Sequence, residues 1–461
     1  MIKITQPIKH DFGNEPEFVI RNQTIERSSW SFNSNQDGAK GTLDCDCRDP
    51  NVDVHVPLCH LCDDYLAIGR QSPISSSDDI SELQKPLSNR YRNRFTNCQF
   101  DRTLHHPSLP QPKDNTLENS TIIDESHWKR EEGFRFIVTA DTQFGILMDG
   151  FEMKEPNWKA EIEISRQTVQ KMNNMKGKER PLFACVCGDL VDTESSFTTA
   201  LAAWKRAHPD WQRDAIFEQQ MIDWKEVWSN LDDDIALVCV CGNHDVGNRP
   251  TAHSIQKWSS SFGDDYLAFW ANGTYHIALN NCLFYDPRNA LDLFEEQVQW
   301  LESRLQYANS KGAKHIFVYS HFPWFLSHEN ETDEEMLGSS FAPEGWGPDG
   351  TKFSDFYFHI PIERRQIAMK LFKEYGVTAC FSGHFHQNLE AKSSWGMDMI
   401  VTGPLSMPLL STVLNAGYDN SLTIGIRAVD VTKEGFVHQF LPLEDQTIPP
   451  LYRFPSHTTA K

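Results

Sequence analysis

The chain has 461 residues, of which 39% are hydrophobic and 23% charged, the balance of a soluble globular protein rather than a disordered one. Its formal net charge of −21 argues against a nucleic-acid partner, because binding a phosphate backbone needs a basic face. The charge does not exclude a phosphate-bearing ligand, since bound divalent cations would reverse the field locally.

Two further features bear on where the protein works. No apolar run approaches the roughly 20 residues needed to span a bilayer, and residues 1–13 lack the apolar core of a signal or transit peptide. The eleven cysteines are odd in number, and Cys185, Cys187, Cys239 and Cys241 lie in apolar runs typical of buried strands. We therefore expect a cytoplasmic protein with reduced cysteines and no membrane contact.

Residues 1–130 lack sustained hydrophobic periodicity and are rich in Ser, Asn, Asp, Pro and Arg, so we expect an irregular or partly disordered N-terminal extension. Within it, two cysteine pairs have spacings that can hold a structural zinc ion. These cysteines are Cys45, Cys47, Cys59 and Cys62, with His55 between the pairs. The first pair has the less typical C-x-C spacing, and reduced cysteines on a surface loop are the alternative interpretation.

From residue 133 onward, short apolar runs alternate with segments of helical periodicity, which predicts an α/β domain over residues 131–445 followed by a tail at 446–461. The expected strands are residues 134–140, 182–187, 235–241, 275–281, 315–320, 377–382, 397–402, 422–430 and 436–441. The expected helices are residues 161–175, 197–231 with an interruption at 208–210, 293–308 and 361–375. The strands that close the chain suggest a second sheet packed on the first, with a hairpin at residues 432–435.

Five of these apolar runs end in side chains that bind metal ions. In open α/β sheets the ligand site lies at the carboxyl ends of the strands, so these side chains should meet in space. One such strand end would be an ordinary turn, but five in one chain predict a metal site built from several loops. The candidate ligands are Asp141, Gln143, Asp189, Asn243, His321, His384 and His386.

These seven side chains combine carboxylate and amide oxygens with imidazole nitrogens, a set that suits Mn, Fe or Zn ions. Seven ligands are too many for one ion and enough for two if one carboxylate bridges. Two cations about 3.5–4 Å apart bind a phosphoryl group, activate a water and stabilise a leaving oxygen. His244 directly follows Asn243, so we expect it to protonate that oxygen as a general acid, with Asp245 orienting it.

The order of these motifs resembles the calcineurin-like metallophosphoesterase superfamily, and most closely the calcineurin-like phosphoesterase domain-containing protein 1 family. The resemblance extends over residues 133–441 and rests on the stretches at 140–145, 242–251, 263–266 and 382–388. It implies a four-layer α/β fold, in which two β-sheets are flanked by helices and a dinuclear metal centre lies at the strand ends. It also implies one ion held by Asp141, Gln143, Asp189 and His386, and another held by Asp189, Asn243, His321 and His384.

Members of the resembled family are protein serine/threonine phosphatases. The leading hypothesis is therefore a metal-dependent phosphomonoesterase acting on phosphoserine and phosphothreonine in a phosphorylated protein. A phosphodiesterase or a small-molecule phosphatase is the alternative, because the motifs would be shared and specificity lies in loops. A non-catalytic scaffold is a third hypothesis, against which the presence of His244 argues. The acidic insertion at residues 327–354 is long enough to cover the site or to select the substrate.

Overall fold

The computed structural model describes residues 132–147, 156–192, 213–332, 339–341, 352–411, 418–419 and 423–443. The expected N-terminal extension, with its four candidate zinc ligands, and the expected tail lie outside these described residues. None of the described helices is long and apolar enough to cross a membrane.

The first sheet has five strands and contains both the start and the end of the domain. β1, β2 and β3 are parallel to one another. On the other side of β1, β14 pairs antiparallel with β1, and β15 pairs antiparallel with β14. Because β1 to β3 are covered on both faces, their sequences are near-continuous apolar runs rather than alternating ones. The strand order is β15 (Phe436–Pro442), β14 (Gly425–Val431), β1 (Phe134–Thr139), β2 (Pro181–Cys187) and β3 (Ala236–Val240).

The second sheet has seven strands with a parallel centre made of β5, β6, β9 and β11, flanked by antiparallel strands. Its order is β13 (Tyr418–Asp419), β10 (Asn388–Lys392), β11 (Asp398–Val401), β9 (Ala379–Ser382), β6 (Ile316–Tyr319), β5 (Thr274–Ala278) and β4 (Leu267–Ala271). A small third sheet joins β12 (Leu410–Ser411), β7 (Ser339–Phe341) and β8 (Lys352–Ser354). Strands β7 and β8 come from the predicted insertion.

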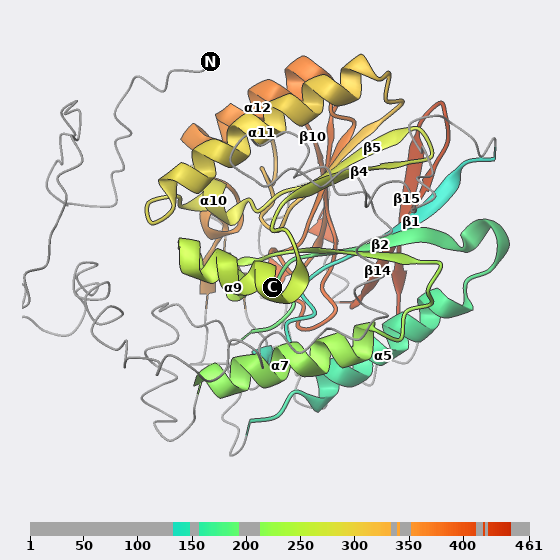
Figure 1. Cartoon of the computed structure of the whole chain (residues 1–461), viewed down its shortest axis with the longest axis vertical. Helices are drawn as coiled ribbons and strands as arrows, with labels where there is room; N and C mark the ends of the chain where they lie inside the picture. Colours follow the sequence, from blue (N-terminus) through green and yellow to red (C-terminus); the bar gives the residue numbers. More distant parts are fainter. Residues whose placement is uncertain are drawn as a thin grey trace, which may run out of the picture. The chain divides into compact units, whose positions relative to one another are not determined.

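Helices cover the outer face of each large sheet (Figure 1). α5 (Lys159–Asn174) and α7 (Arg213–Trp228) pack together outside the first sheet, and α11 (Leu291–Ser310) and α12 (Ile362–Tyr375) outside the second. The short helices are η2 (Gly177–Glu179), α8 (Asn243–Val246), α9 (Ala252–Phe262), α10 (Cys282–Tyr285) and η3 (Asp355–Phe358). The order helix, sheet, sheet, helix confirms the predicted four-layer α/β fold.

The two large sheets pack face to face on a core that is dominated by aromatic rings. Phe136 of β1 and Phe183 of β2 stack with their ring centroids 4.9 Å apart. Phe136 also meets Phe317 of β6 and Phe381 of β9 edge-on, at 5.6 and 5.7 Å. Aromatic pairs in these arrangements add attraction to that of apolar burial. The core therefore fixes the strand ends of one sheet against those of the other.

Two features of the topology differ from the sequence prediction. The closing strands do not form a second sheet of their own, because β9 to β11 join strands β4 to β6, whereas β14 and β15 return to the first sheet. The hairpin that joins β14 to β15 has its turn at residues 432–435, as predicted. Strand β4 is absent from the predicted strands, although Asn272-Gly273 is a strong hairpin signal and both residues have a positive φ.

Glu161, in the first turn of α5, is a buried carboxyl beneath the loop that follows Gln143. Its Oε1 accepts hydrogen bonds from the backbone nitrogens of Gly145 (3.2 Å) and Leu147 (3.4 Å). Burial raises the pKa of Glu161 to about 7, against the opposing effect of these backbone hydrogen bonds. The fold binds this proton more tightly than the unfolded chain does, so stability is lost as the pH rises from 4.5 through about 7.

We expect Glu161→Gln to remove this pH dependence, because the amide is neutral and its oxygen can still accept from the loop. When the pH rises from 5 to 8, the unfolding free energy of the wild type should fall by about 2–3 kcal/mol more than that of the variant. Chemical unfolding at both pH values measures this difference. A difference between the two proteins that is the same at both pH values would contradict the raised pKa.

Candidate metal centre

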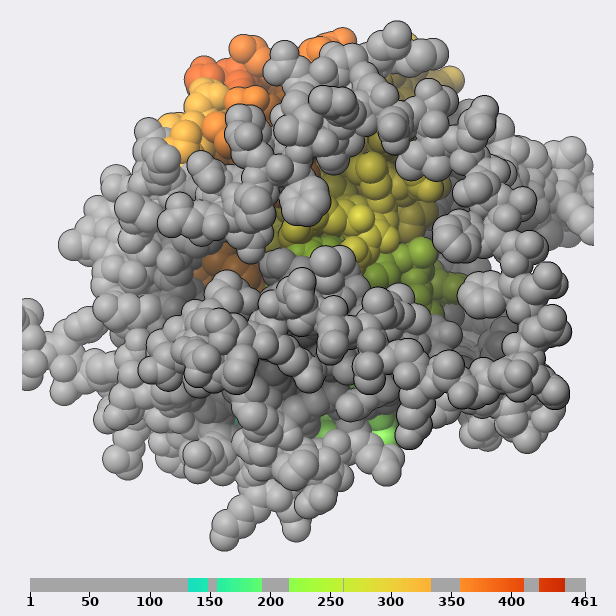
Figure 2. All heavy atoms as spheres, turned by 90° about the vertical axis from the view of Figure 1, so that its left-hand side faces the viewer, coloured from blue at the N-terminus to red at the C-terminus, as the bar shows by residue number. Residues whose placement is uncertain are grey.

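All seven predicted ligands follow a strand of one of the two large sheets, and each is at most 5% exposed. β1 and β2 run from right to left in Figure 1, so their carboxyl ends face the viewer in Figure 2, where green and yellow parts of the chain are exposed together. The ligands are Asp141 and Gln143 after β1, Asp189 after β2, Asn243 after β3, His321 after β6, and His384 and His386 after β9.

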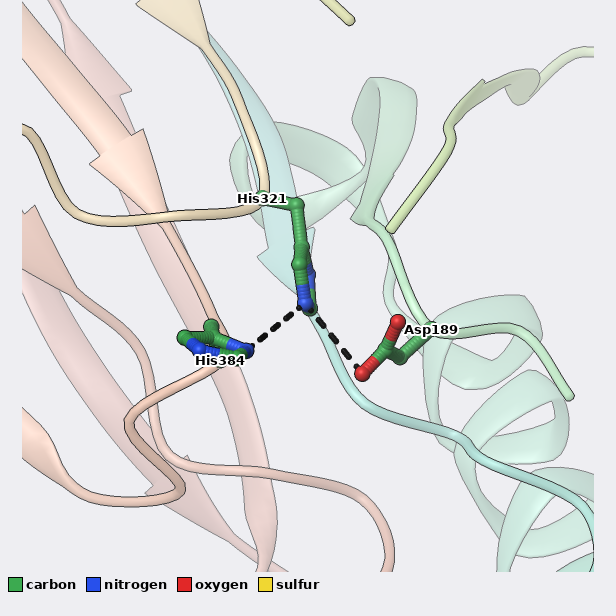
Figure 3. A group of neighbouring side chains, drawn as sticks. All are labelled: Asp189, His321 and His384. Atoms are coloured by element: carbon green, nitrogen blue, oxygen red, sulfur yellow. Dashed lines mark hydrogen bonds and ion pairs between the residues drawn. The ribbon is translucent and has the colours of Figure 1, made fainter. Parts of the chain in front are cut away.

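His321 lies at the centre of one ligand group. Its Nε2 is 3.2 Å from Asp189 Oδ2, 2.9 Å from Asn243 Oδ1 and 3.1 Å from His384 Nδ1. Figure 3 shows three of these side chains pointing toward one another from separate strand ends. The other ring nitrogen of His321 donates to the backbone oxygen of Cys187 at 2.9 Å, which leaves Nε2 to bind a metal. These four ligands are the set that the family resemblance assigns to one ion.

His386 lies beside Asp141 in a second group of candidate ligands. His386 Nε2 is 3.5 Å from Asp141 Oδ1, and its Nδ1 donates to the backbone oxygen of Met407. The Asp141 carboxylate accepts from the backbone nitrogen of His384, at 3.1 and 3.0 Å from its two oxygens. Asp141 Oδ1 is also 4.0 Å from His321 Nδ1. The two ligand groups are therefore neighbours in one buried site.

Gln143 has the amide orientation that a metal ligand needs. Its Nε2 is 3.0 Å from Asp192 Oδ1, and because a carboxylate only accepts hydrogen bonds, the amide nitrogen must be the atom that faces Asp192. The amide oxygen is left buried, without a hydrogen-bond partner in the described part of the chain. Burying an oxygen in this way costs free energy, which a bound cation would offset. The residues present therefore fit a divalent metal.

The backbone at the site adopts conformations that few side chains tolerate. Among the described residues other than glycine, six have a φ between 40° and 64°, and five of these six are predicted ligands. Such conformations cost about 1–3 kcal/mol each and persist where the surrounding structure enforces them, often at functional sites. The five are Asp141, Gln143, Asp189, His384 and His386.

Two glycines allow the strand ends to approach closely enough for the ligands to meet. A Cβ added at Gly188, which has a φ of 86°, would collide with the ring of His321. A Cβ added at Gly242 would collide with the carboxylate of Asp189. The Gly-Asp and Gly-Asn pairs of the sequence therefore serve close packing between strand ends as well as turn formation.

His244 is partly exposed, with 35% of its side chain accessible. Its backbone nitrogen donates to Asp189 Oδ1 at 2.9 Å, and its ring Nδ1 is 3.1 Å from Asp192 Oδ1. Burial would lower the pKa of His244, but the carboxylates of Asp189 and Asp192 raise it well above its usual value. Both carboxylates thus favour the protonated ring, the form that a general acid requires.

Asp245 does not orient His244, contrary to the sequence prediction, and Asp192 holds that position instead. The Asp245 carboxylate accepts from the backbone nitrogens of Gly242 (2.7 Å), Leu190 (3.0 Å) and Val191 (3.3 Å). The physical reason is helix capping: residues 243–246 form the one-turn helix α8, so a carboxylate at its third position folds back onto the N-cap nitrogen. Asp245 therefore ties the loop after β2 to the start of α8.

The charges of the ligands suit metal binding. Burial would raise the pKa of Asp189, but the imidazoles of His321 and His244 lower it below its usual range, so the residue is a carboxylate. Burial and the neighbouring His321 lower the pKa of His384 well below its usual value, which favours the neutral imidazole that metals bind. Burial opposes ionisation of His321, yet Asp189 raises its pKa to about 9, so a metal at Nε2 would displace a proton.

Asn281, three residues after the end of β5, is a positioning residue that is absent from the predicted set. Its Oδ1 accepts from the backbone nitrogens of His321 (3.2 Å) and Phe322 (3.1 Å), and its Nδ2 donates to Phe322 O at 2.8 Å. These bonds fix the loop that carries His321. The signal in the sequence is its place after a strand that points toward the same edge as the ligands.

We expect Gln143→His to tighten metal binding in the Asp141 group, because imidazole is a better ligand than an amide oxygen for Mn, Fe or Zn. One ring nitrogen can keep the hydrogen bond to Asp192 while the other binds the metal. Titration of metal into chelator-stripped protein measures the affinity, and Gln143→Ala should weaken it. An unchanged or weaker affinity in the His variant would remove Gln143 from the ligand set.

The chain is similar to known proteins in both sequence and structure. The family model of the calcineurin-like phosphoesterases matches residues 134–388. The serine/threonine-protein phosphatase CPPED1 of Danio rerio is 30% identical over 336 residues, which cover 72% of this chain and 91% of that protein. The Homo sapiens protein of the same name is 30% identical over 334 residues, covering 72% and 90%. A solved dimetal phosphatase from Danio rerio has a TM-score of 0.42 and 14% identity, over 68% of this chain and 97% of that chain.

The chain therefore belongs to the calcineurin-like phosphoesterase family, whose members are metal-dependent phosphoesterases. Within that family it groups with the CPPED1 serine/threonine-protein phosphatases. The predicted family and the prediction of an enzyme are confirmed, and the scaffold hypothesis finds no support.

Proposed function

We propose that the protein is a dinuclear phosphomonoesterase that removes phosphate from phosphoserine and phosphothreonine in proteins. The observation that carries this proposal is the pair of neighbouring ligand groups around His321 and Asp141, which the hydrogen bond from the His384 backbone to Asp141 joins. Seven ligands exceed what one ion of this kind takes. Sharing the buried carboxylate of Asp189 would let two ions lie side by side.

The ligand side chains divide between the two ions as the family resemblance implies. Asp141, Gln143, Asp189 and His386 would hold one ion, and Asp189, Asn243, His321 and His384 the other. When bound, the ions supply positive charge that stabilises the phosphoryl group and lowers the pKa of the attacking water. The mixed oxygen and nitrogen donors favour Mn, Fe or Zn.

His244 supplies the acid of the reaction in this proposal. A serine or threonine alkoxide is a poor leaving group, and it needs a proton as the bond from phosphorus to oxygen breaks. The imidazolium of His244 is next to the ligand Asn243, is held by Asp192 at 3.1 Å and reaches solvent. From this position His244 could protonate the leaving oxygen, which is what the hydrolysis of a phosphate monoester of an alcohol requires.

The substrate class rests on the relatives. The curated relatives are named serine/threonine-protein phosphatases, and this chain covers 90% or more of the two compared above. A phosphorylated protein is therefore the partner that we propose, in the cytoplasm. The net charge of −21 gives no reason to add a nucleic acid, and no described helix could span a membrane.

Rates on matched esters test the proposed substrate class. The purified protein should release phosphate from phosphoserine and phosphothreonine peptides faster than from a phosphotyrosine peptide of the same sequence. It should also cleave p-nitrophenyl phosphate faster than bis(p-nitrophenyl) phosphate. Preference for the bis ester would favour a phosphodiesterase, and hydrolysis of p-nitrophenyl phosphate without any peptide hydrolysis would favour a small-molecule phosphatase.

A further inference from the structure

Tyr357 lies at the metal centre although no predicted motif contains it. It belongs to η3, which follows the insertion at residues 327–354 and precedes α12. We propose that the Tyr357 hydroxyl donates a hydrogen bond to a phosphoryl oxygen of the bound substrate. Tyr357 is then a substrate-binding residue that the segment after the insertion brings to the site. The inference depends on the proposed function in one respect, which is that the bound substrate is a phosphate monoester.

The backbone of Tyr357 is fixed directly to a metal ligand. His384 Nε2 lies 3.2 Å from Tyr357 O, and donation to that carbonyl leaves Nδ1 as the metal-binding nitrogen of His384. The Tyr357 ring packs beside the His384 ring, with centroids 5.0 Å apart and an interplanar angle of 50°. The residue is thus placed by two contacts to the same ligand.

The hydroxyl of Tyr357 is surrounded by groups of the reaction centre. The side-chain amides of Asn248 and Asn243 hydrogen-bond to it, and the charges of His244 and Asp189 act on it. A tyrosine hydroxyl is protonated at neutral pH, because its usual pKa is about 10. A protonated phenol is both a donor and an acceptor, and it can accept from an amide while donating to a phosphoryl oxygen.

The side from which substrate approaches follows from which groups reach solvent. The seven ligands are at most 5% exposed, whereas His244 and Tyr357 are both partly exposed. The Tyr357 hydroxyl hydrogen-bonds to Asn243, which directly precedes His244 in the chain, so the two residues lie close together. A phosphoryl group within reach of the His244 proton is therefore also beside the Tyr357 hydroxyl.

Buried contacts just after Tyr357 in the chain hold the segment that carries it. Ile360 donates its backbone N–H to Pro323 O at 3.1 Å, which ties the segment to the loop after His321. Arg365 of α12 pairs with Glu331 at 3.4 Å, and both side chains are fully buried. A donor that is already positioned loses little conformational entropy when substrate binds. The position of Tyr357 is therefore suited to binding rather than to closing over the site.

Tyr357→Phe tests the inference, because it keeps the ring and the carbonyl that contacts His384 and removes only the hydroxyl. A hydrogen bond to a charged group is worth about 1.5–3 kcal/mol, so we expect kcat/KM for p-nitrophenyl phosphate to fall roughly 10–100-fold. Inorganic phosphate, measured by calorimetry, should bind more weakly by a similar factor, while metal content stays at the wild-type level. Tyr307→Phe on α11 makes the same chemical change outside the second sheet and should alter none of these quantities.

Phosphate affinity and kcat/KM within twofold of the wild type would overturn the inference. So would a loss of both that disappears once metal occupancy is restored, because the hydroxyl would then act only by orienting the ligand Asn243. Phosphate binding requires no turnover and no protein substrate. If the wild type cleaves no phosphopeptide, the proposed substrate class fails while the phosphate measurement still decides the role of Tyr357.

Discussion

Asp189→Asn should lower phosphate release by roughly 10³-fold or more and deplete the protein of metal. Asp189 is 1% exposed, its Oδ2 is 3.2 Å from His321 Nε2, and its Oδ1 accepts from the backbone nitrogen of His244. It is the one carboxylate that we assign to both ions. The substitution keeps the size of the side chain but removes its charge and one of its two oxygens, so both ions lose the carboxylate that would bridge them.

Metal content by mass spectrometry and initial rates on a phosphoserine peptide measure this outcome. Asp430→Asn is the matched control, since Asp430 pairs with Arg135 at the surface of the first sheet and its side chain is 43% exposed. The control should keep both the rate and the metal. Wild-type metal stoichiometry together with a wild-type rate in Asp189→Asn would contradict the assignment of a bridging ligand.

His244→Asn should lower turnover of a phosphoserine peptide by about 10²–10⁴-fold, the usual contribution of general acid catalysis. The fall should be much smaller for p-nitrophenyl phosphate, because a nitrophenolate leaves without needing a proton. Metal content should stay near the wild-type level, since the His244 side chain contacts Asp192 and is not among the proposed ligands. The two rates and the metal content are measured on the same preparation.

The other outcomes for His244→Asn identify different roles. A small and equal loss on both substrates would mean that His244 only packs at the end of a strand. A large and equal loss with depleted metal would place the residue in the metal shell. Asp192→Asn should give a weaker version of the same leaving-group dependence. It removes one of the two carboxylates that raise the pKa of His244 and leaves the ring in place.

The meeting of the seven candidate ligands in one buried site could be predicted because it depends on local patterns. Each ligand follows an apolar run, and parallel strands bring their carboxyl ends to one edge. Asp189 after β2 and His321 after β6 could therefore each be placed at the carboxyl edge of a sheet without knowing which strands pair. Two sheets that share an aromatic core are enough to bring those edges together.

The order of the strands and the partner of His244 were not predictable in the same way. The return of β14 and β15 to the side of β1 depends on pairing across almost 300 residues, as between Phe134 and Val431, which no local pattern encodes. The choice between Asp192 and Asp245 depends on a single turn of helix that folds one carboxylate back onto the backbone. Tyr357 carries no metal-ligand signal at all, and only the packing of η3 against His384 reveals it.

The number of metal ions that turnover requires tests the dinuclear proposal most directly. Chelator-treated protein is titrated with Mn²⁺ or Zn²⁺ while phosphate release from a phosphoserine peptide and bound metal per chain are followed together. We predict no turnover in the stripped protein and full recovery only when two ions are bound per chain. Full activity with one ion per chain, or turnover that survives complete removal of metal, would contradict a dinuclear phosphatase.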